Sequence, residues 1–358
     1  MSANVLNVGI AGLGRSGWDI HARTLRGLKS LYRVAAVTDS QPERCREATA
    51  ALGCRAHPDL DSLLDDRELD LVVIATPSHL HAGQTIAALE CGRHVVCEKP
   101  MALSAGDADR MIDAAARAQK VLTVFQNMRY WEDFRTVRDV IGSGKLGRIV
   151  QIRITMHRFA RRWDWQTLSE FGGGALFNAG AHLVDLALQL LGPGELHVSA
   201  ELQRTLSSGD APDHAKILLR AAGAPTIEIE ISNACAYPQE TWHVMGTAGG
   251  LRGTPERLEW KWVEATALSP RPVDRSTAAA DRRFNREELP WQEQSWSKGS
   301  VESPDYAEFY EDLHGPIRSG GAPVITAASV RRTLAVLERC GASAEELARQ
   351  VAAVDPSK

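Results

Sequence analysis

The sequence predicts an α/β protein of two domains, in which a doubly wound parallel sheet is followed by a mostly antiparallel one. The chain has 358 residues, which is longer than a single hydrophobic core usually serves. Its first third alternates short apolar runs with amphipathic helical patterns, as parallel sheets do. From Tyr130 onward, apolar and polar residues alternate with period two between turn signals, as in antiparallel strands. We therefore place the domains at residues 1–127 and 128–358.

The composition excludes several classes of protein. The formal net charge of −4 gives no electrostatic basis for binding nucleic acid or an anionic membrane. Since no apolar run reaches about 18 residues, we expect no membrane-spanning segment. The N-terminus has no basic segment before its first apolar run, which predicts no signal peptide. Six scattered cysteines without a Cys-x-x-Cys pair indicate free thiols, no thiolate metal site and a cytoplasmic protein.

A glycine-rich turn opens the first domain. Residues 5–10 form a short apolar run that predicts a buried strand, and Gly12-Leu-Gly14-Arg-Ser-Gly17 leads from it into a helical pattern. A second apolar strand ends at Asp39, 22 residues after Gly17. This is the strand–turn–helix–strand–acid order of a dinucleotide-binding unit. Gly12 would permit the tight turn, Gly14 the approach of the backbone to a pyrophosphate, and Gly17 the packing of helix on sheet.

Asp39 bears on the choice of cofactor. A carboxylate at the end of the second strand accepts both ribose hydroxyls and repels a 2′-phosphate, which favours NAD(H). Arg44 lies close enough in the sequence to reach such a phosphate. We therefore predict NAD(H) as the preferred cofactor, with NADP(H) left open.

The alternation of helices and strands continues to the end of the first domain. Helical patterns at 42–53, 60–66, 81–92 and 104–119 alternate with strands at 69–77, 94–100 and 121–127. Ligands bind beyond the carboxyl ends of such strands, where Ala75-Thr76-Pro77, Glu98-Lys99-Pro100 and Gln126-Asn127 emerge. Lys99, beside a glutamate and a proline, is a candidate for a residue of the binding cleft. From its position alone, it could equally be a solvated lysine at the surface.

An apolar segment of the second domain carries polar side chains at helical spacing. Residues 172–192, GGGALFNAGAHLVDLALQLLG, predict a glycine-rich loop followed by a buried helix. Asn178, His182, Asp185 and Gln189 stand at offsets of 0, 4, 7 and 11, so they share an arc of roughly 60° on a continuous helix. A polar stripe on a buried helix needs partners, either in the interior or in a cleft that holds a polar ligand.

The alternating segments of the second domain predict strands at 147–158, 196–206, 214–222, 225–234, 242–250 and 257–265. In TIEIEIS, three isoleucines face one side and two glutamates the other. One face of the sheet is therefore expected to pack on helices, and the other to face solvent or a partner.

Two arginines and two tryptophans precede the glycines of the apolar segment: Arg161, Arg162, Trp163 and Trp165. Tryptophan stacks on sugar C–H faces and arginine binds hydroxyls or carboxylates, so this set suits a polyhydroxylated ring. Core tryptophans with surface arginines remain the alternative. His79 and His81 form a His-x-His pair without a third ligand, and we expect no metal site there.

Four stretches together resemble the glucose–fructose oxidoreductase / inositol dehydrogenase / MocA (Gfo/Idh/MocA) family. They are residues 11–17 (AGLGRSG), 75–81 (ATPSHLH), 88–104 (ALECGRHVVCEKPMALS) and 172–192. The resemblance implies an N-terminal Rossmann domain and a C-terminal α+β domain with an open, mostly antiparallel sheet. It also implies NAD(H) or NADP(H), a sugar or cyclitol substrate, and a homo-oligomer, dimer or tetramer, formed through that sheet.

The resemblance assigns roles to particular residues. Lys99 corresponds to the family's Glu-Lys-Pro lysine and His182 to its catalytic histidine, whereas Asn178 stands where the family usually has an aspartate. An asparagine can bind a substrate hydroxyl but carries no charge, which implies another substrate, another balance of proton transfer or a weakened enzyme. The expected cofactor-binding set comprises Gly12, Gly14, Arg15, Ser16, Gly17, Asp39, Arg44, Thr76, Pro77, His81, Glu98, Lys99 and Asn127.

The expected reaction is reversible hydride transfer between a secondary alcohol carbon and a nicotinamide. His182 would accept the hydroxyl proton, Lys99 would stabilise charge on the same oxygen, and Asn178 would orient the substrate. Asp185 would steady the imidazole or contact the substrate, together with the two arginines and two tryptophans. NAD-dependent glycoside hydrolysis and a non-catalytic NAD-binding regulator remain as alternatives; Asn178 favours the regulator, while Lys99 and His182 weigh against it.

Overall fold

The first sheet is parallel and doubly wound, as predicted. The structure, a computed structural model, describes residues 5–273, 275, 286–299 and 306–354. Six strands follow the order β3-β2-β1-β4-β5-β6, so the chain reverses direction between β1 and β4. All five pairings are parallel, and the carboxyl ends of the strands meet at one edge. The strands are β1 (Leu6–Ala11), β2 (Tyr32–Thr38), β3 (Arg55–Ala56), β4 (Leu71–Ile74), β5 (His94–Cys97) and β6 (Leu122–Val124).

Helices cover the two faces of this sheet because its strands are apolar on both sides. Every residue of β4 is buried, and only one residue of β1 is partly exposed. Local signals mark the helix ends: Gly53 takes a left-handed conformation after the last residue of α2, and Ser104 caps the start of α5 by accepting from the Asp107 amide. The helices are a π-helical turn Ser16–Ala22 that runs into α1 (Arg23–Gly27), α2 (Pro42–Leu52), α3 (Leu60–Leu64), α4 (His81–Glu90) and α5 (Ala105–Ala118).

The second sheet has eight strands in the order β14-β13-β12-β11-β7-β10-β9-β8, and only β7 and β10 pair in parallel. The mostly antiparallel sheet is therefore confirmed. Two of its strands were not predicted. β12 begins after a turn within the segment 242–250, which was expected to be one strand, and β14 is almost entirely polar. The strands are β7 (Ile149–His157), β8 (His197–Gln203), β9 (His214–Arg220), β10 (Thr226–Ser232), β11 (Trp242–Gly246), β12 (Gly249–Thr254), β13 (Arg257–Trp262) and β14 (Gln292–Ser297).

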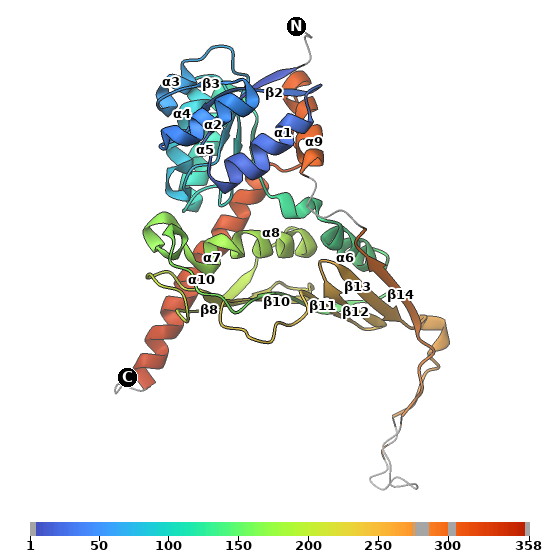
Figure 1. The fold of residues 1–358 in the computed structure, drawn as a ribbon. Helices are drawn as coiled ribbons and strands as arrows, with labels where there is room; N and C mark the ends of the chain where they lie inside the picture. The colour runs from blue at the N-terminus through green and yellow to red at the C-terminus, as the bar shows by residue number, and fades with distance from the viewer. Residues whose placement is uncertain (1–4, 274, 276–285, 300–305, 355–358) are drawn as a thin grey trace.

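One face of the second sheet packs on helices, as the alternation in β10 predicted. Ile227, Ile229 and Ile231 are at most 4% exposed, and each contributes about 1.5–3 kcal/mol by burial. On the other face, Glu228 and Glu230 form ion pairs with Lys216. Figure 1 shows α8 (Gly180–Leu191) lying between this sheet and the first domain.

The apolar segment 172–192 is not one continuous helix, contrary to expectation. α7 (Gly174–Asn178) ends at Asn178, and α8 begins at Gly180, after Ala179. The helical segments on either side of Ala179 meet at 45°. The common arc predicted for four polar residues therefore does not exist: Asn178 ends one helix, His182 and Asp185 lie on the next, and Gln189 is exposed.

Two C-terminal helices join the halves of the molecule. α9 (Ala307–Ser319) packs against α1, and α10 (Ala327–Val354) contacts β8 and α8 of the second domain and α5 and β6 of the first. In Figure 1, α10 runs from the first sheet past the second. The boundary after residue 127 stays a prediction. The remaining helix, α6 (Glu132–Gly142), packs next to the short turn Asn127–Tyr130.

Within the described ranges, no single helix is long and apolar enough to cross a membrane; Ser169–Asn178 and Gly180–Leu191 reach that length and composition only as a bent pair.

Candidate active site

The glycine-rich turn after β1 is shaped for a close ligand. Gly12 has φ of +91°, and a Cβ there would lie 2.6 Å from the Ala75 carbonyl oxygen. A Cβ on Gly17 would lie 1.8 Å from the Gly12 carbonyl oxygen, so both positions need glycine for the turn's own packing. Gly14 differs, because a Cβ there would meet nothing within 4 Å. Its backbone faces open space, which fits the approach of a pyrophosphate.

The predicted ribose-binding carboxylate already has partners. Asp39 accepts hydrogen bonds from the amides of Leu13 at 2.6 Å and Gln41 at 2.8 Å. Arg44 Nη1 lies 3.5 Å from both carboxylate oxygens. The Asp39 side chain is 5% exposed and that of Arg44 is 40% exposed. Each oxygen of the Asp39 carboxylate accepts one backbone amide and has a further lone pair that can accept from a ligand hydroxyl. The Arg44 guanidinium lies beside this carboxylate at the surface.

His81 holds two loops together at the carboxyl ends of the strands. Its ring nitrogens lie 2.7 Å from the Pro100 carbonyl oxygen and 2.9 Å from that of Thr76. Burial lowers the pKa of His81, which is 1% exposed. The side chain was expected in the cofactor-binding set, but no part of it faces a cleft. It joins the Ala75-Thr76-Pro77 loop to the loop that carries Lys99, whose bond to Pro100 is cis.

Glu98 also faces inward. Its Oε2 accepts from the Lys99 amide at 2.9 Å, and His21 Nε2 donates to Oε1 at 3.2 Å. Burial opposes ionisation, but the hydrogen bond and charge of His21 and the charge of Lys99 lower the pKa of Glu98 to about 2. On the other side of the His21 ring, the Tyr310 hydroxyl lies 2.7 Å from Nδ1. Since α9 is remote in sequence, no local pattern pointed to His21 or Tyr310.

Lys99 and His182, two of the predicted catalytic side chains, come from different domains: Lys99 follows β5, and His182 lies on α8. Lys99 Nζ donates to the Asn178 side-chain oxygen at 3.3 Å and to its carbonyl oxygen at 3.2 Å. Burial lowers the pKa of Lys99; the charge of Glu98 opposes this, and those of Arg15 and Arg162 add to it. Burial and the charge of Lys99 lower the pKa of His182 to about 3. Its imidazole is therefore neutral at physiological pH.

His182 Nδ1 is buried and has no hydrogen-bond partner in the described part of the chain. A buried ring nitrogen without a partner costs about 1–3 kcal/mol. It marks a position where a ligand group can complete the hydrogen bonding. Together with Lys99, it gives the site one neutral proton acceptor and one cation close by.

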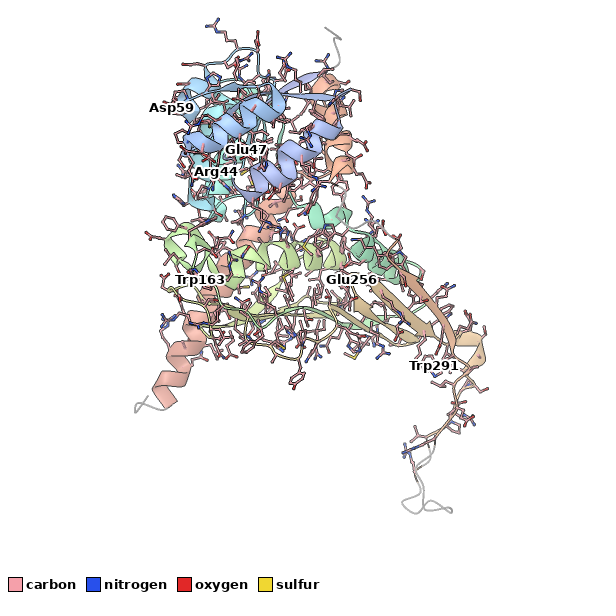
Figure 2. The ribbon with its side chains drawn as sticks, viewed as in Figure 1. Arg44, Glu47, Asp59, Trp163, Glu256 and Trp291 are labelled. Atoms are coloured by element: carbon pink, nitrogen blue, oxygen red, sulfur yellow. The ribbon has the colours of Figure 1, made fainter. Side chains whose placement is uncertain are left out.

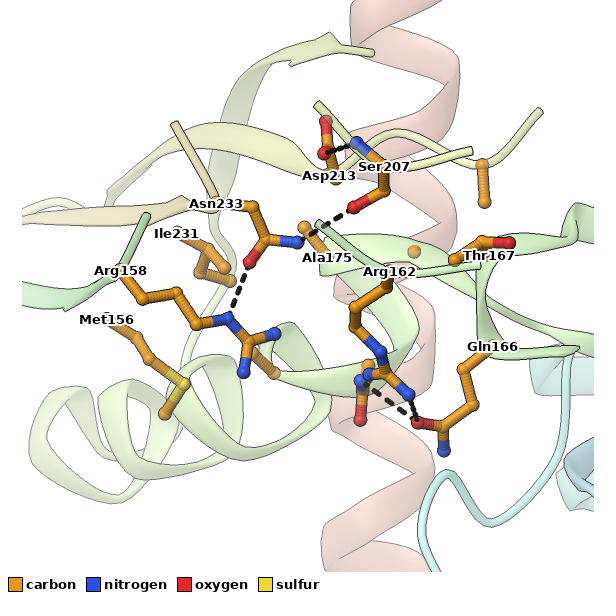
Figure 3. Close-up of a pocket in the computed structure, with 14 residues that line it drawn as sticks. Met156, Arg158, Arg162, Gln166, Thr167, Ala175, Ser207, Asp213, Ile231 and Asn233 are labelled. Atoms are coloured by element: carbon orange, nitrogen blue, oxygen red, sulfur yellow. Dashed lines mark hydrogen bonds between the residues drawn. The ribbon is translucent and has the colours of Figure 1, made fainter. Parts of the chain in front are cut away.

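A recess adjoins Asn178 in the second domain, and Figure 3 shows its lining. The recess is narrow: its free volume is about 30 Å³, which is room for about one or two water molecules. Arg162 Nη2 donates to Gln166 Oε1 at 2.6 Å, and the Asn178 side-chain nitrogen lies 3.5 Å from the same oxygen. Polar side chains thus connect Lys99 through Asn178 to the recess. The polar lining includes Arg158, Arg162, Gln166, Asn178, Asp213 and Asn233.

Asp185 does not take the role expected of it. Its carboxylate accepts two hydrogen bonds from Arg129, at 2.7 and 2.6 Å, and one from Thr333 at 3.0 Å. The residue is 1% exposed and lies outside the recess lining. Among the described residues, Asp185 forms no hydrogen bond with His182. It fastens α8 to the turn Asn127–Tyr130 and to α10.

Of the two arginines and two tryptophans predicted to bind a sugar, only Arg162 lines the recess. Trp163 is 80% exposed and Trp165 is 39% exposed, so they are neither core residues nor part of the recess. Figure 2 shows Trp163 at the edge of the second domain. Arg161 is exposed as well. Alternation indicated a strand up to residue 158, and this concealed Arg158 as a recess residue.

Three further residues of the cofactor set lie around the same edge. Arg15 is exposed, and its charge acts on Lys99 and on Tyr306. The Asn127 side chain forms a hydrogen bond with the Tyr306 hydroxyl. Thr76 donates to Gln84 at 2.6 Å. No group of three histidine, cysteine, aspartate or glutamate side chains that could hold a metal occurs among the described residues, and the six cysteines are free.

Comparison with known proteins gives matches in both halves of the chain. Residues 6–126 match the family described as "Oxidoreductase family, NAD-binding Rossmann fold", and residues 134–252 match "GFO/IDH/MocA C-terminal domain". Inositol 2-dehydrogenase 2 of Saccharopolyspora erythraea is 30% identical over 81% of this chain and 84% of its own. The scyllo-inositol 2-dehydrogenase (NADP(+)) IolW of Bacillus subtilis is 28% identical over 60% of each chain.

Among solved structures, the WlbA dehydrogenase from Bordetella pertussis in complex with NADH and UDP-GlcNAcA superposes with a TM-score of 0.75. It is 25% identical and covers 95% of this chain and 97% of its own. Several curated relatives are matched over only about 60% of their own length.

Proposed function

Because the chain belongs to the Gfo/Idh/MocA family of NAD-binding oxidoreductases, we propose that it is an NAD(P)-dependent dehydrogenase or reductase. Its substrate is a sugar, cyclitol or sugar derivative, and the reacting carbon is a secondary alcohol or a ketone. The observation that carries the proposal is that Lys99 of the first domain reaches Asn178 at the end of α7 and acts electrostatically on His182 of α8, beside a polar recess. Curated relatives named as inositol dehydrogenases support the substrate class.

The nicotinamide of the bound cofactor would supply or accept the hydride. Neutral His182 accepts the hydroxyl proton during oxidation, and Lys99 donates a hydrogen bond to the same oxygen. Asn178 holds the ammonium of Lys99 on the recess side and offers its amide to the substrate. The lowered pKa of His182 leaves the imidazole neutral in the free protein, as a proton acceptor must be.

We further propose that NAD(H) is preferred. Asp39 at the end of β2 offers oxygens to ribose hydroxyls and repels a 2′-phosphate. Arg44 beside it lessens that repulsion, so NADP(H) remains a second cofactor. One relative is named for NADP(+) and another was solved with NADH, so both cofactors occur among the relatives.

The outer face of the second sheet is our proposed contact between subunits of a dimer or tetramer. Its ion pairs link Arg153, Lys216, Glu228 and Glu230 across three neighbouring strands. Paired charges leave a nearly neutral surface that a second copy could cover. Light scattering after size-exclusion chromatography measures the mass; a monomer at micromolar concentration contradicts this part of the proposal.

The test of function is a screen of sugars, cyclitols and their keto derivatives, with NAD(H) and NADP(H) in parallel, following the absorbance of the reduced nicotinamide. We expect net cofactor reduction by at least one alcohol. Turnover without net reduction would indicate a hydrolase on the same scaffold. Cofactor binding without any turnover would indicate a regulator.

On an active substrate, His182→Ala should lower kcat by roughly 10²–10⁴-fold, because the proton acceptor is lost. Gln189→Ala, at the exposed end of the same helix, is the matched control and should keep full activity. If His182→Ala retains more than about a tenth of the turnover, the proposed role of His182 is wrong.

A further inference from the structure

We propose that the recess beside Asn178 takes the anionic group of a sugar or polyol, and that the Arg158 guanidinium pairs with this carboxylate or phosphate. This inference rests on the proposed function and names the substrate class of the same site. Two observations support the inference: which charged side chains line the recess, and which hydrogen-bond partners these side chains already have. Arg158 has no role in the sequence-based prediction.

Arg158 is held in place without being neutralised. It directly follows β7, and its Nε donates to the Asn233 side-chain oxygen at 2.6 Å. Asn233 is 7% exposed and is itself held, through its side-chain nitrogen, by Ser207 Oγ at 3.2 Å. Within the described ranges, Arg158 forms no ion pair with a carboxylate, so the two terminal nitrogens of its fork keep their donors. A fixed fork with free donors is the group that proteins use to bind carboxylate or phosphate.

The carboxylates near the recess are committed elsewhere. Asp213 lines it, but accepts hydrogen bonds from the amides of Thr205, Leu206 and Ser207 at 2.6, 3.1 and 2.7 Å, and from the Thr205 hydroxyl at 2.8 Å. Asp164 receives two hydrogen bonds from Arg162, at 3.0 and 2.8 Å. Neither carboxylate lies within ion-pair distance of Arg158.

The cations of the recess therefore outnumber the carboxylates that face it. Arg158 and Arg162 line it together with one carboxylate, Asp213, and Lys99 adjoins it through the uncharged Asn178. Figure 3 shows Arg158 and Arg162 extending toward the recess from the same segment of chain. Burial, and then the charge of Arg162, lower the pKa of Arg158, so the two guanidinium groups act on each other unfavourably. An anionic group on the substrate relieves this repulsion.

The position of the excess charge indicates which part of the substrate carries the anion. The reacting oxygen belongs at Lys99 and His182, which lie outside the recess lining, whereas Arg158 lines the recess at the end of β7. The anion is thus a substituent away from the reacting carbon. A hexuronate, an aldonate or a hexose phosphate has this arrangement, and a neutral inositol does not.

The experiment measures binding and turnover separately. Protein loaded with NADH is titrated by calorimetry with matched sets of probes: glucuronate, gluconate, glucose-6-phosphate, glucose and myo-inositol, with their galactose and mannose counterparts. We expect at least one anionic probe to bind about tenfold or more tightly than its neutral parent. Carboxylates and phosphates form separate arms, so the ranking identifies which anion the recess accepts.

The variants attribute that preference to one side chain. Arg158→Gln should reduce the anionic preference to about twofold or less, and Arg158→Lys should retain part of it, since the charge stays while the fork is lost. Arg220→Gln, which removes an exposed arginine at the end of β9, should bind like the parent protein. Thermal unfolding of each variant checks that the loss of the Asn233 hydrogen bond has not unfolded it; if Arg158→Gln unfolds, the comparison rests on Arg158→Lys.

Equal binding of anionic and neutral probes, including no binding of any, overturns the inference. So does an anionic preference that survives in Arg158→Gln. Anionic binding without turnover contradicts the proposed function and leaves the inference standing. Turnover of neutral sugars alone supports the proposed function and contradicts the inference of an anionic substrate.

Discussion

At the scale of single residues, the site is governed by burial of groups that are charged in water. Lys99 and His182 both have lowered pKa values because they are removed from solvent beside each other. Asn178 accepts a hydrogen bond from Lys99 but brings no negative charge that would offset the effect of burial. The asparagine thus has an electrostatic effect that residue type alone could not reveal. Its effect depends on the distance to Lys99, which only the fold determines.

The substitution Asn178→Asp tests this effect. A carboxylate in hydrogen-bond distance of Lys99 favours the ammonium and should raise the pKa of Lys99 toward its ordinary value or above. The alkaline fall of kcat/KM in the oxidation direction should then move to higher pH by about one unit or more. Steady-state rates measured across the alkaline range, with Asn178→Ser as the uncharged control, give the answer. If kcat/KM of Asn178→Asp falls at the same alkaline pH as in the parent protein, the proposed influence of residue 178 on the pKa of Lys99 is wrong.

The acid side of the same profile follows from His182. Its pKa of about 3 keeps the imidazole neutral well below the ordinary histidine range. Oxidation needs the neutral ring, so kcat/KM should not fall as the pH passes through about 6.5. A fall centred near that value in the parent protein would show that the free enzyme titrates an ordinary histidine.

At the scale of elements, local patterns predicted what local forces decide. The strand, glycine turn and helix at the N-terminus were predictable because Gly12 and Gly17 are required by backbone geometry. The interruption between α7 and α8 was not predictable from local patterns. At this interruption the Asn178 carbonyl oxygen accepts a hydrogen bond from Lys99, which belongs to the other domain. β14 was missed because its sequence, QEQSWS, lacks apolar alternation and lies at the edge of its sheet. Arg158 was hidden in a predicted strand for a related reason: only tertiary packing shows that the recess begins where β7 ends.

The buried ion pair on α8 allows a test of its structural role. Asp185→Asn removes the charge that faces Arg129 and leaves a buried guanidinium without its counter-ion, which costs about 3–5 kcal/mol of unfolding free energy. Urea unfolding measures this loss. At a temperature where the variant is folded, KM for substrate should stay within about twofold, because Asp185 lies outside the recess.

A large rise in KM with little loss of stability would instead return Asp185 to the substrate site. Arg331, which pairs with Asp109 at the surface, provides the control. Its replacement by glutamine should change the unfolding free energy by at most about 1 kcal/mol.

At the scale of the whole molecule, buried histidines link stability to pH. Burial lowers the pKa of His81, His94 and His182, to about 4 for His94 and about 3 for His182. The unfolded chain binds protons on these rings near pH 6.5, whereas the folded chain does not. Below that pH the unfolded state therefore holds more protons, and stability falls as the pH falls.

We expect the unfolding free energy to decrease by about 1.4 kcal/mol per pH unit for each of these histidines as acid is added below about pH 6. Urea unfolding at a series of pH values measures the slope. In the variant His94→Asn, the asparagine side chain can still accept from the Val121 amide. The slope of unfolding free energy against pH should be smaller in this variant by the contribution of one histidine. A slope that is the same in the variant would contradict the contribution of His94.

The helix α10 has a consequence for how the two halves of the molecule can move. Its 28 residues extend about 42 Å, and they contact strands and helices of both domains. A helix packed against both halves resists any movement that pulls them apart along its length. We expect any relative movement of the two halves to be a rotation about this helix.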